Sequence, residues 1–196
     1  MEVQTLGVSK KNSSRLGAHI VFLDESGFLM LPTVVRTWAP RGKTPLLRHR
    51  FRRDKVSAIS AISVSPKRQR VGLYYRLYQH NIKRVDVRAF LSHLLRHLRA
   101  DVFVLLDRAS IHLGPDLRQL ETRSGRLHLE YFPGYAPELN PDEGVWCLLK
   151  RWLANDCPQD ADDLQIELIG RLDDLRESPN KLRACIRHSG LPTFLR

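Results

Sequence analysis

The chain has little cysteine and no long apolar run. Its 196 residues include only three cysteines, Cys147, Cys157 and Cys185. Their number is odd and no Cys-x-x-Cys pair occurs, which favours reduced thiols over a disulfide framework or a cysteine zinc site. No apolar run approaches the ~18 residues that span a membrane, and residues 1–15 lack the apolar core of a secretion signal. We therefore expect a cytoplasmic protein with no membrane partner.

Acidic residues are also scarce, and the charge is unevenly distributed. The chain has 32 Lys and Arg against 21 Asp and Glu, a formal net charge of +11. One basic stretch has a single acid, Asp54, among the cations Arg36, Arg41, Lys43, Arg48, Arg50, Arg52, Arg53 and Lys55. A second basic cluster lies at 67–70, whereas acids dominate 156–177. This segregation favours contact with a nucleic-acid backbone; a basic face that serves only solubility is the alternative.

The apolar pattern predicts one domain, residues 19–196, after a flexible segment at 1–18. We expect a first hairpin with strands at 19–23 and 28–31, its first strand ending at Asp24 and its turn starting at Gly27. The other predicted strands span 57–64, 71–78, 102–106 and 127–132. The predicted helices span 86–99 (with Asp86 as N-cap), 114–124, 140–154 and two segments after 162 that break near 178–180. This order predicts an α/β fold, a mixed sheet with helices on its faces.

Two carboxylates directly follow apolar strands. Asp24 comes after residues 20–23, and Asp107 comes after residues 102–106. Because ligands of open α/β sheets bind beyond the carboxyl ends of strands, acids on neighbouring strands could converge there. An Asp that pairs with arginine or begins a turn is the alternative for Asp24. His112 could support such a site, but the simpler interpretation, a polar residue before the next helix, is slightly favoured.

A third acid, Glu143, lies at the predicted start of a helix. In Asn140-Pro141-Asp142-Glu143 the order of residues is that of a capping box, which explains the glutamate without any chemistry. Asp142 competes with Glu143, but adjacent helical side chains point roughly 100° apart, so at most one of them should face a site. Taken together, three convergent carboxylates fit two Mg²⁺ or Mn²⁺ ions, which prefer oxygen ligands and can support phosphoryl transfer.

Four sequence strings follow one another between residues 20 and 155: FLDESGF (22–28), RTWAPRG (36–42), LD with ASIH (106–107 and 109–112) and YAPELNPDEGVW (135–146). In this order they resemble DDE transposases of the Tc/mariner superfamily, in the branch found in bacterial insertion sequences. The resemblance implies a ribonuclease-H-like fold. It also implies that Asp24, Asp107 and Glu143 form the catalytic and metal-binding triad, with Glu143 rather than Asp142 in register.

The resemblance further implies a reaction and its partners. Water would cleave the element ends and the freed 3′-hydroxyl would transfer the strand, without a covalent protein–DNA intermediate. The partners would be element-end DNA, target DNA and a second copy of the chain, as a homodimer on DNA in the bacterial nucleoid. The candidate DNA-binding residues are Arg36, Trp38, Arg41, Lys43, Arg48, Arg50, Arg52, Arg53 and Lys55. The segment around Trp38 is expected to contact DNA or the partner subunit.

Three features depart from the family pattern. Arg108 stands where the family usually has Asn, and a cation there could oppose metal binding or hold phosphate. Asp107 and Glu143 are separated by 35 residues, one more than expected, which an added loop residue before Pro133 would accommodate. The family's helix-turn-helix modules have no counterpart before the first strand, which predicts a split or truncated frame and a separate recognition protein from an upstream frame. A non-catalytic DNA-binding remnant and a structure-selective nuclease of the same fold are the alternative functions.

Overall fold

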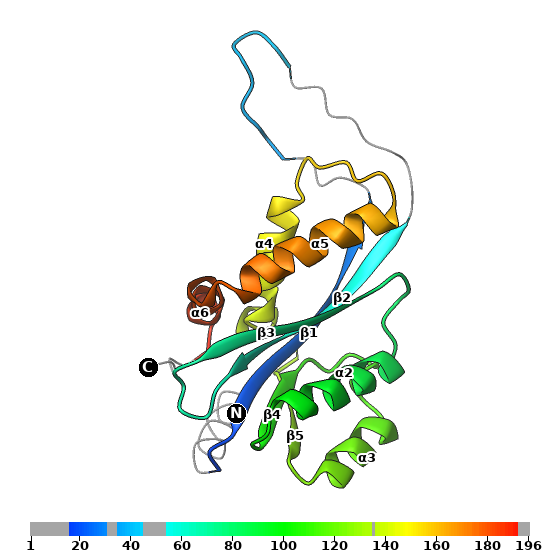
Figure 1. Ribbon diagram of the computed structural model, residues 1–196, viewed down its shortest axis with the longest axis vertical. Helices are drawn as coiled ribbons and strands as arrows, with labels where there is room; N and C mark the ends of the chain where they lie inside the picture. The colour runs from blue at the N-terminus through cyan, green and yellow to red at the C-terminus, as the bar shows by residue number, and fades with distance from the viewer. Residues whose placement is uncertain (1–15, 31–34, 45–53, 135, 192–196) are drawn as a thin grey trace.

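The structure, a computed structural model, describes residues 16–30, 35–44, 54–134 and 136–191. Its framework is a five-stranded sheet with the order β3-β2-β1-β4-β5 (Figure 1). The strands are β1 (His19–Leu29), β2 (Lys55–Val64), β3 (Val71–Tyr78), β4 (Val102–Leu106) and β5 (Leu127–Tyr131). The pairs β1–β2 and β2–β3 are antiparallel, whereas β1–β4 and β4–β5 are parallel. The sheet is therefore mixed, as predicted.

β1 is one continuous strand, so the predicted first hairpin with a turn at Gly27 is wrong. β2 pairs with β1 along almost its whole length, and Gly27 stands opposite Ser57 within that ladder. This long ladder outweighs the local turn preference of the sequence Asp-Glu-Ser-Gly. Because β4 pairs only with residues 19–22 of β1, β1 runs past the carboxyl end of β4 and carries Asp24 just beyond it.

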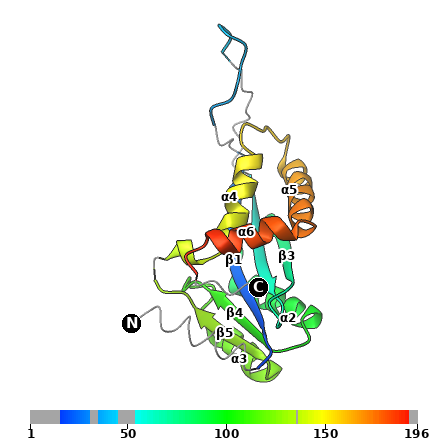
Figure 2. The ribbon, with the colours of Figure 1, turned by 90° about the vertical axis from the view of Figure 1, so that its left-hand side faces the viewer.

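Helices cover both faces of the sheet (Figures 1 and 2). They are α2 (Arg84–His97), α3 (Pro115–Ser124), the short 3₁₀ helix η1 (Pro137–Leu139), α4 (Asp142–Trp152), α5 (Ala161–Arg176) and α6 (Pro179–His188). α2 and α3 pack on one face, where Val21 and Leu23 of β1 are buried. α4, α5 and α6 pack on the other face, over Phe22. Strand alternation therefore turns Asp24 toward α4 and Glu25 toward the opposite face.

The second hairpin and the predicted helices are confirmed, although several ends differ. α2 begins at Arg84, and the carboxylate of Asp86 accepts a hydrogen bond from Lys83 N at 2.8 Å. Lys83 is thus the N-cap residue, and the assignment of Asp86 to that position is wrong. Of the predicted flexible segment, residues 1–15 lie outside the described residues, and Ala18 is buried. No helix within the described ranges is long and apolar enough to cross a membrane.

Candidate active site

Asp24 lies on β1 opposite Ser60 of β2, two positions beyond the last β1 residue that pairs with β4. The Nε1–H group of Trp146, from α4, donates a hydrogen bond to Asp24 Oδ2 at 3.0 Å. Burial raises the pKa of Asp24 to about 7, and the charges of Glu143 and Glu25 add to this effect, while hydrogen bonds from the Glu25 backbone and Trp146 oppose it. A cation bound beside Asp24 would therefore favour its ionised form.

Asp107 follows β4 directly and is tied to the loop after that strand. Ala109 N donates a hydrogen bond to Asp107 Oδ1 at 2.9 Å, and His112 Nδ1 lies 2.5 Å from the same oxygen. His112 Nε2 lies 2.9 Å from Glu25 Oε1. The imidazole therefore joins a carboxylate on β1 to the carboxylate at the end of β4. Its hydrogen bond is the main cause that lowers the pKa of Asp107.

His112 is completely buried, and its imidazole is protonated on both nitrogens, and so positively charged, at neutral pH. Burial alone would lower its pKa, but the hydrogen bonds and negative charges of Asp107 and Glu25 raise the pKa to about 10. Both ring nitrogens are then donors, one to each carboxylate. The favoured interpretation of His112 as a simple polar residue before a helix is thus wrong. Glu25 was not predicted from the sequence. The one sequence feature that could have pointed to it is strand alternation, which turns its side chain to the face opposite Asp24.

The start of α4 separates Asp142 from Glu143. Asp142 is completely buried, and burial followed by the charge of Asp24 raises its pKa well above the ordinary range, which Ser60 only partly opposes. Burial thus favours the uncharged carboxylic acid form of Asp142. Glu143 is exposed and lines the same pocket as Asp24. The two adjacent side chains thus point in different directions, as expected for a helix.

The capping box that could explain Glu143 without chemistry does not form. The Asn140 N–H group bonds to Pro137 O at 2.9 Å, so it is not the partner of the Glu143 carboxylate. Asn140 Oδ1 accepts a hydrogen bond from Asp142 N at 3.2 Å, and Asn140 Nδ2 donates one to Leu23 O at 3.2 Å. The Asn140 side chain therefore ties the first turn of α4 to β1 and sets the position of Glu143.

Asp24, Asp107 and Glu143 line one pocket of about 490 Å³. The other residues that line it are Arg108, Ala109, Phe132, Pro133, Gly134, Ala136, Pro137 and Asn140. Among the residues that the structure describes, no three His, Cys, Asp or Glu side chains form a ready-made metal cluster. The donor chemistry still fits a divalent cation, because three carboxylates face one space and a cation would offset the burial and the repulsion that raise the pKa of Asp24.

None of the predicted DNA-binding residues that the structure describes lines this pocket. Arg36, Trp38, Arg41 and Lys43 belong to segment 35–44, which projects away from the sheet (Figure 1), and Trp38 is completely exposed. Asn155, just after α4, anchors this segment: its Nδ2 donates to Val35 O at 3.1 Å, and its Oδ1 accepts from Val35 N at 3.0 Å. Lys55 begins β2, and the predicted contacts Arg48, Arg50, Arg52 and Arg53 lie outside the described residues.

A mixed sheet in this strand order, flanked by helices on both faces, has the ribonuclease-H-like architecture. The catalytic domain of Mos1 mariner transposase matches it with a TM-score of 0.57 and 14% identity, over 98% of this chain and 94% of that chain. The chain belongs to the DDE superfamily endonucleases, whose family model matches residues 19–165.

Two further proteins are also similar. The Mos1 transposase paired-end complex with left transposon end matches with a TM-score of 0.61 and 16% identity, over 96% of this chain and 61% of that chain. Other Mos1 structures contain Mg or Mn. An uncharacterized protein of Sinorhizobium fredii, y4pE/y4sA, is 31% identical over 84 residues, which make up 42% of this chain and 59% of that protein. The chain thus spans less than two thirds of these two proteins, and the Mos1 similarity establishes its fold.

Proposed function

We propose that this chain is a transposase catalytic domain that cleaves DNA and transfers the cut strand in a divalent-metal-dependent reaction. The observation that carries the proposal is the pocket shared by Asp24, Asp107 and Glu143, together with the raised pKa of Asp24. Membership of the DDE endonuclease family and the fold of a transposase catalytic domain support it.

Asp24, Asp107 and Glu143 would together hold Mg²⁺ or Mn²⁺, and we propose two ions. When bound, the metal would offset the negative charge of the reacting phosphate and lower the pKa of the attacking hydroxyl group or water. The chain's own contribution is positioning. Trp146 holds one oxygen of Asp24, and His112 holds one oxygen of Asp107, so both carboxylates are restricted in rotation before any ligand binds.

Arg108 lines the pocket beside these acids and is exposed. Its planar guanidinium presents several donors that match the oxygens of a phosphate. We therefore assign Arg108 to a phosphate of the DNA strand that enters the pocket. In this role its positive charge acts on the substrate, and the departure from the family pattern is compatible with catalysis.

The DNA would consist of the element ends and then the target, bound by two copies of the chain. The exposed Trp38 and its basic neighbours in segment 35–44 project from the sheet, where they can reach DNA or a partner subunit outside the pocket. Their charge suits phosphate contacts. We propose that a separate helix-turn-helix protein supplies the recognition of the element ends, in the bacterial nucleoid.

The reaction can be tested with a plasmid that carries this reading frame with its genomic flanks. We expect Mg²⁺- or Mn²⁺-dependent strand cleavage in the flanks. Where an upstream frame encodes a helix-turn-helix protein, that protein is added to the reaction. Asp24→Asn should abolish it. Asp174→Asn is the matched control, because Asp174 is an exposed carboxylate on α5 outside the pocket. Cleavage by the Asp24→Asn protein at the wild-type rate would refute the assignment.

A non-catalytic DNA-binding remnant is the second candidate, and the observation that favours it is the cationic Arg108 in the pocket. Calorimetric titration with Mn²⁺ separates the two functions. A catalytic domain should bind Mn²⁺ in a way that Asp107→Asn abolishes and Asp174→Asn preserves. A remnant should show no binding that depends on the pocket carboxylates.

A further inference from the structure

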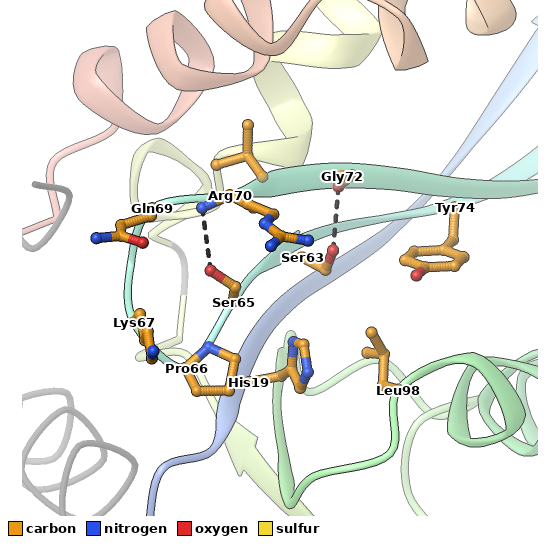
Figure 3. A pocket seen from close by; sticks show the side chains of 11 residues that line it. His19, Ser63, Ser65, Pro66, Lys67, Gln69, Arg70, Gly72, Tyr74 and Leu98 are labelled. Carbon is orange, nitrogen blue, oxygen red and sulfur yellow. Dashed lines mark hydrogen bonds between the residues drawn. The ribbon is translucent and has the colours of Figure 1, made fainter.

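A second pocket, also of about 490 Å³, lies where β1 begins, near the amino end of β4 and the turn between β2 and β3 (Figure 3). It is lined by His19, Ser63, Ser65, Pro66, Lys67, Gln69, Arg70, Val71, Gly72, Tyr74 and Leu98. His19 is the first residue of β1, and residues 65–70 form the turn between β2 and β3. The carboxylates line the first pocket, beyond the carboxyl end of β4, and the described residues that line the two pockets do not overlap.

The second pocket has the opposite charge from the first. None of the described residues that line it is acidic, whereas Lys67 and Arg70 bring two positive charges to its rim. Both side chains are exposed, and neither forms an ion pair within the part of the chain that the structure describes. Two unpaired cations around a concave surface are suited to an anion such as phosphate.

The turn that carries these cations is held in place before any ligand binds. Ser65 N bonds to Arg70 O at 2.9 Å, and Arg70 N bonds to Ser65 Oγ at 3.0 Å. Arg68 has the left-handed φ of 60° that non-glycine residues seldom adopt, and its buried side chain donates hydrogen bonds to Ala18 O at 3.1 Å and Ser65 O at 3.3 Å. The Arg68 side chain thus fixes the turn to the start of β1, while Lys67 and Arg70 remain at the pocket.

The walls of the pocket are largely apolar and include an aromatic ring. Figure 3 shows Tyr74 and Leu98 on one side of the space and Pro66 and Lys67 on the other, with the Arg70 guanidinium beside Ser63. The ring of Tyr74 packs near His97 of α2, with ring centroids 5.9 Å apart. A cationic rim next to an aromatic wall is the combination with which proteins bind unpaired nucleotides, because the phosphate meets the cations and the base meets the ring.

We propose that this second pocket binds one unpaired nucleotide of a DNA strand, with its phosphate on Lys67 and Arg70 and its sugar and base against Tyr74. The pocket volume lies within the range of small-ligand sites, roughly 300–1,000 Å³. The inference rests on the proposed function for the identity of the polyanion. It adds a DNA contact near the amino end of β4, apart from the pocket of the carboxylates, where a strand can be held while another part of the DNA occupies the first pocket.

Fluorescence anisotropy with labelled single-stranded (dT)20 in EDTA tests the proposal. The double variant Lys67→Gln/Arg70→Gln should bind about tenfold more weakly, and the slope of log affinity against log salt should fall by about 0.7 for each phosphate that is no longer bound. Arg118→Gln/Arg123→Gln is the matched control, because it removes two exposed charges from α3. Its affinity should change less than twofold.

Tyr74→Leu tests the aromatic wall separately. It should weaken binding of (dT)20 about tenfold, in the range expected for the removal of one base stack, but leave binding of a duplex of equal length unchanged. Equal losses of affinity in the Lys67/Arg70 and control variants, or an unchanged affinity of Tyr74→Leu for (dT)20, would overturn the proposal. The two proposals fail on different measurements. Failure of the wild-type protein to bind Mn²⁺ would refute the catalytic assignment, whereas binding of (dT)20 is measured in EDTA and does not depend on a metal.

Discussion

Replacing His112 by asparagine would remove the buried cation that joins Glu25 on β1 to Asp107 after β4. The two ring nitrogens lie 2.9 and 2.5 Å from these carboxylates. Removing one partner of a buried ion pair costs about 3–5 kcal/mol. The rise of the His112 pKa from 6.5 to about 10 corresponds to roughly 5 kcal/mol. Both figures predict that His112→Asn is strongly destabilising at pH 7.

The effect should depend on pH with a definite sign. The unfolded chain loses the imidazole proton near pH 6.5, whereas the folded protein keeps it up to about pH 10. The stabilisation is therefore complete below pH 6.5 and is lost as the pH rises toward 10. Each unit in this window removes roughly 1.4 kcal/mol from the free energy of unfolding. The difference between wild type and His112→Asn should thus shrink by roughly 3 kcal/mol from pH 7 to pH 9.

Urea denaturation in EDTA at pH 7, 8 and 9, followed by tryptophan fluorescence, measures this difference. The range ends well below the pKa of the Cys185 thiol, which burial raises to about 11. Should His112→Asn not fold, Glu25→Gln keeps the ring and its bond to Asp107, and it should show a smaller loss in the same direction. A difference below about 1 kcal/mol at pH 7, or one that does not change with pH, would refute the reasoning.

Three further substitutions test separate parts of the site. Asp24→Asn should stabilise the metal-free protein at pH 8 by roughly 2–4 kcal/mol. The folded pKa of Asp24 is about 7, so the stability that its protonated form contributes below pH 3.8 is lost as the pH rises through 7, and asparagine avoids this loss. Lower stability of the variant in urea denaturation would contradict this. Asp142→Asn should change stability by less than about 2 kcal/mol and preserve calorimetric Mn²⁺ binding, since burial favours the uncharged form of that carboxyl; loss of Mn²⁺ binding would identify it as a ligand. Gly144→Ala should cost about 1–3 kcal/mol, because its Cβ would lie 2.9 Å from Cys185 Cβ; an unchanged Tm would show that α4 and α6 separate freely.

The pattern of apolar and polar residues along the chain was sufficient to predict most of the fold. The five consecutive apolar residues of β4 are buried in the structure, and the helical spacing in α2 marks a real amphipathic face. It failed at β1, where Gly27 and its polar neighbours favour a turn locally. The deciding interaction there is the ladder with β2, which pairs Gly27 with Ser57. Pairing with a strand so distant in the chain cannot be detected from local sequence preference.

The candidate site was predictable only in part. The choice of Glu143 over Asp142 rested on family register, and in the structure Glu143 lines the pocket while Asp142 is buried. The His112 bridge was not predictable, because its contact with Glu25 joins residues 87 positions apart and depends on the path of the loop after β4. The basic cluster at 67–70 was visible as charge, but nothing in the sequence indicates that Arg68 turns inward while its neighbours line a pocket.

The most direct test of the account is metal-dependent cleavage by a single-site variant of the pocket. Glu143→Gln retains the size of the side chain at the start of α4 and removes its charge, and it should be compared with Asp174→Asn on the plasmid with genomic flanks in Mn²⁺. Glu143→Gln should lose cleavage at least about 100-fold, since even residues that support metal ligands contribute 10- to 100-fold, while Asp174→Asn should cleave normally. Cleavage by Glu143→Gln at the wild-type rate would contradict the claim that these carboxylates are the catalytic centre.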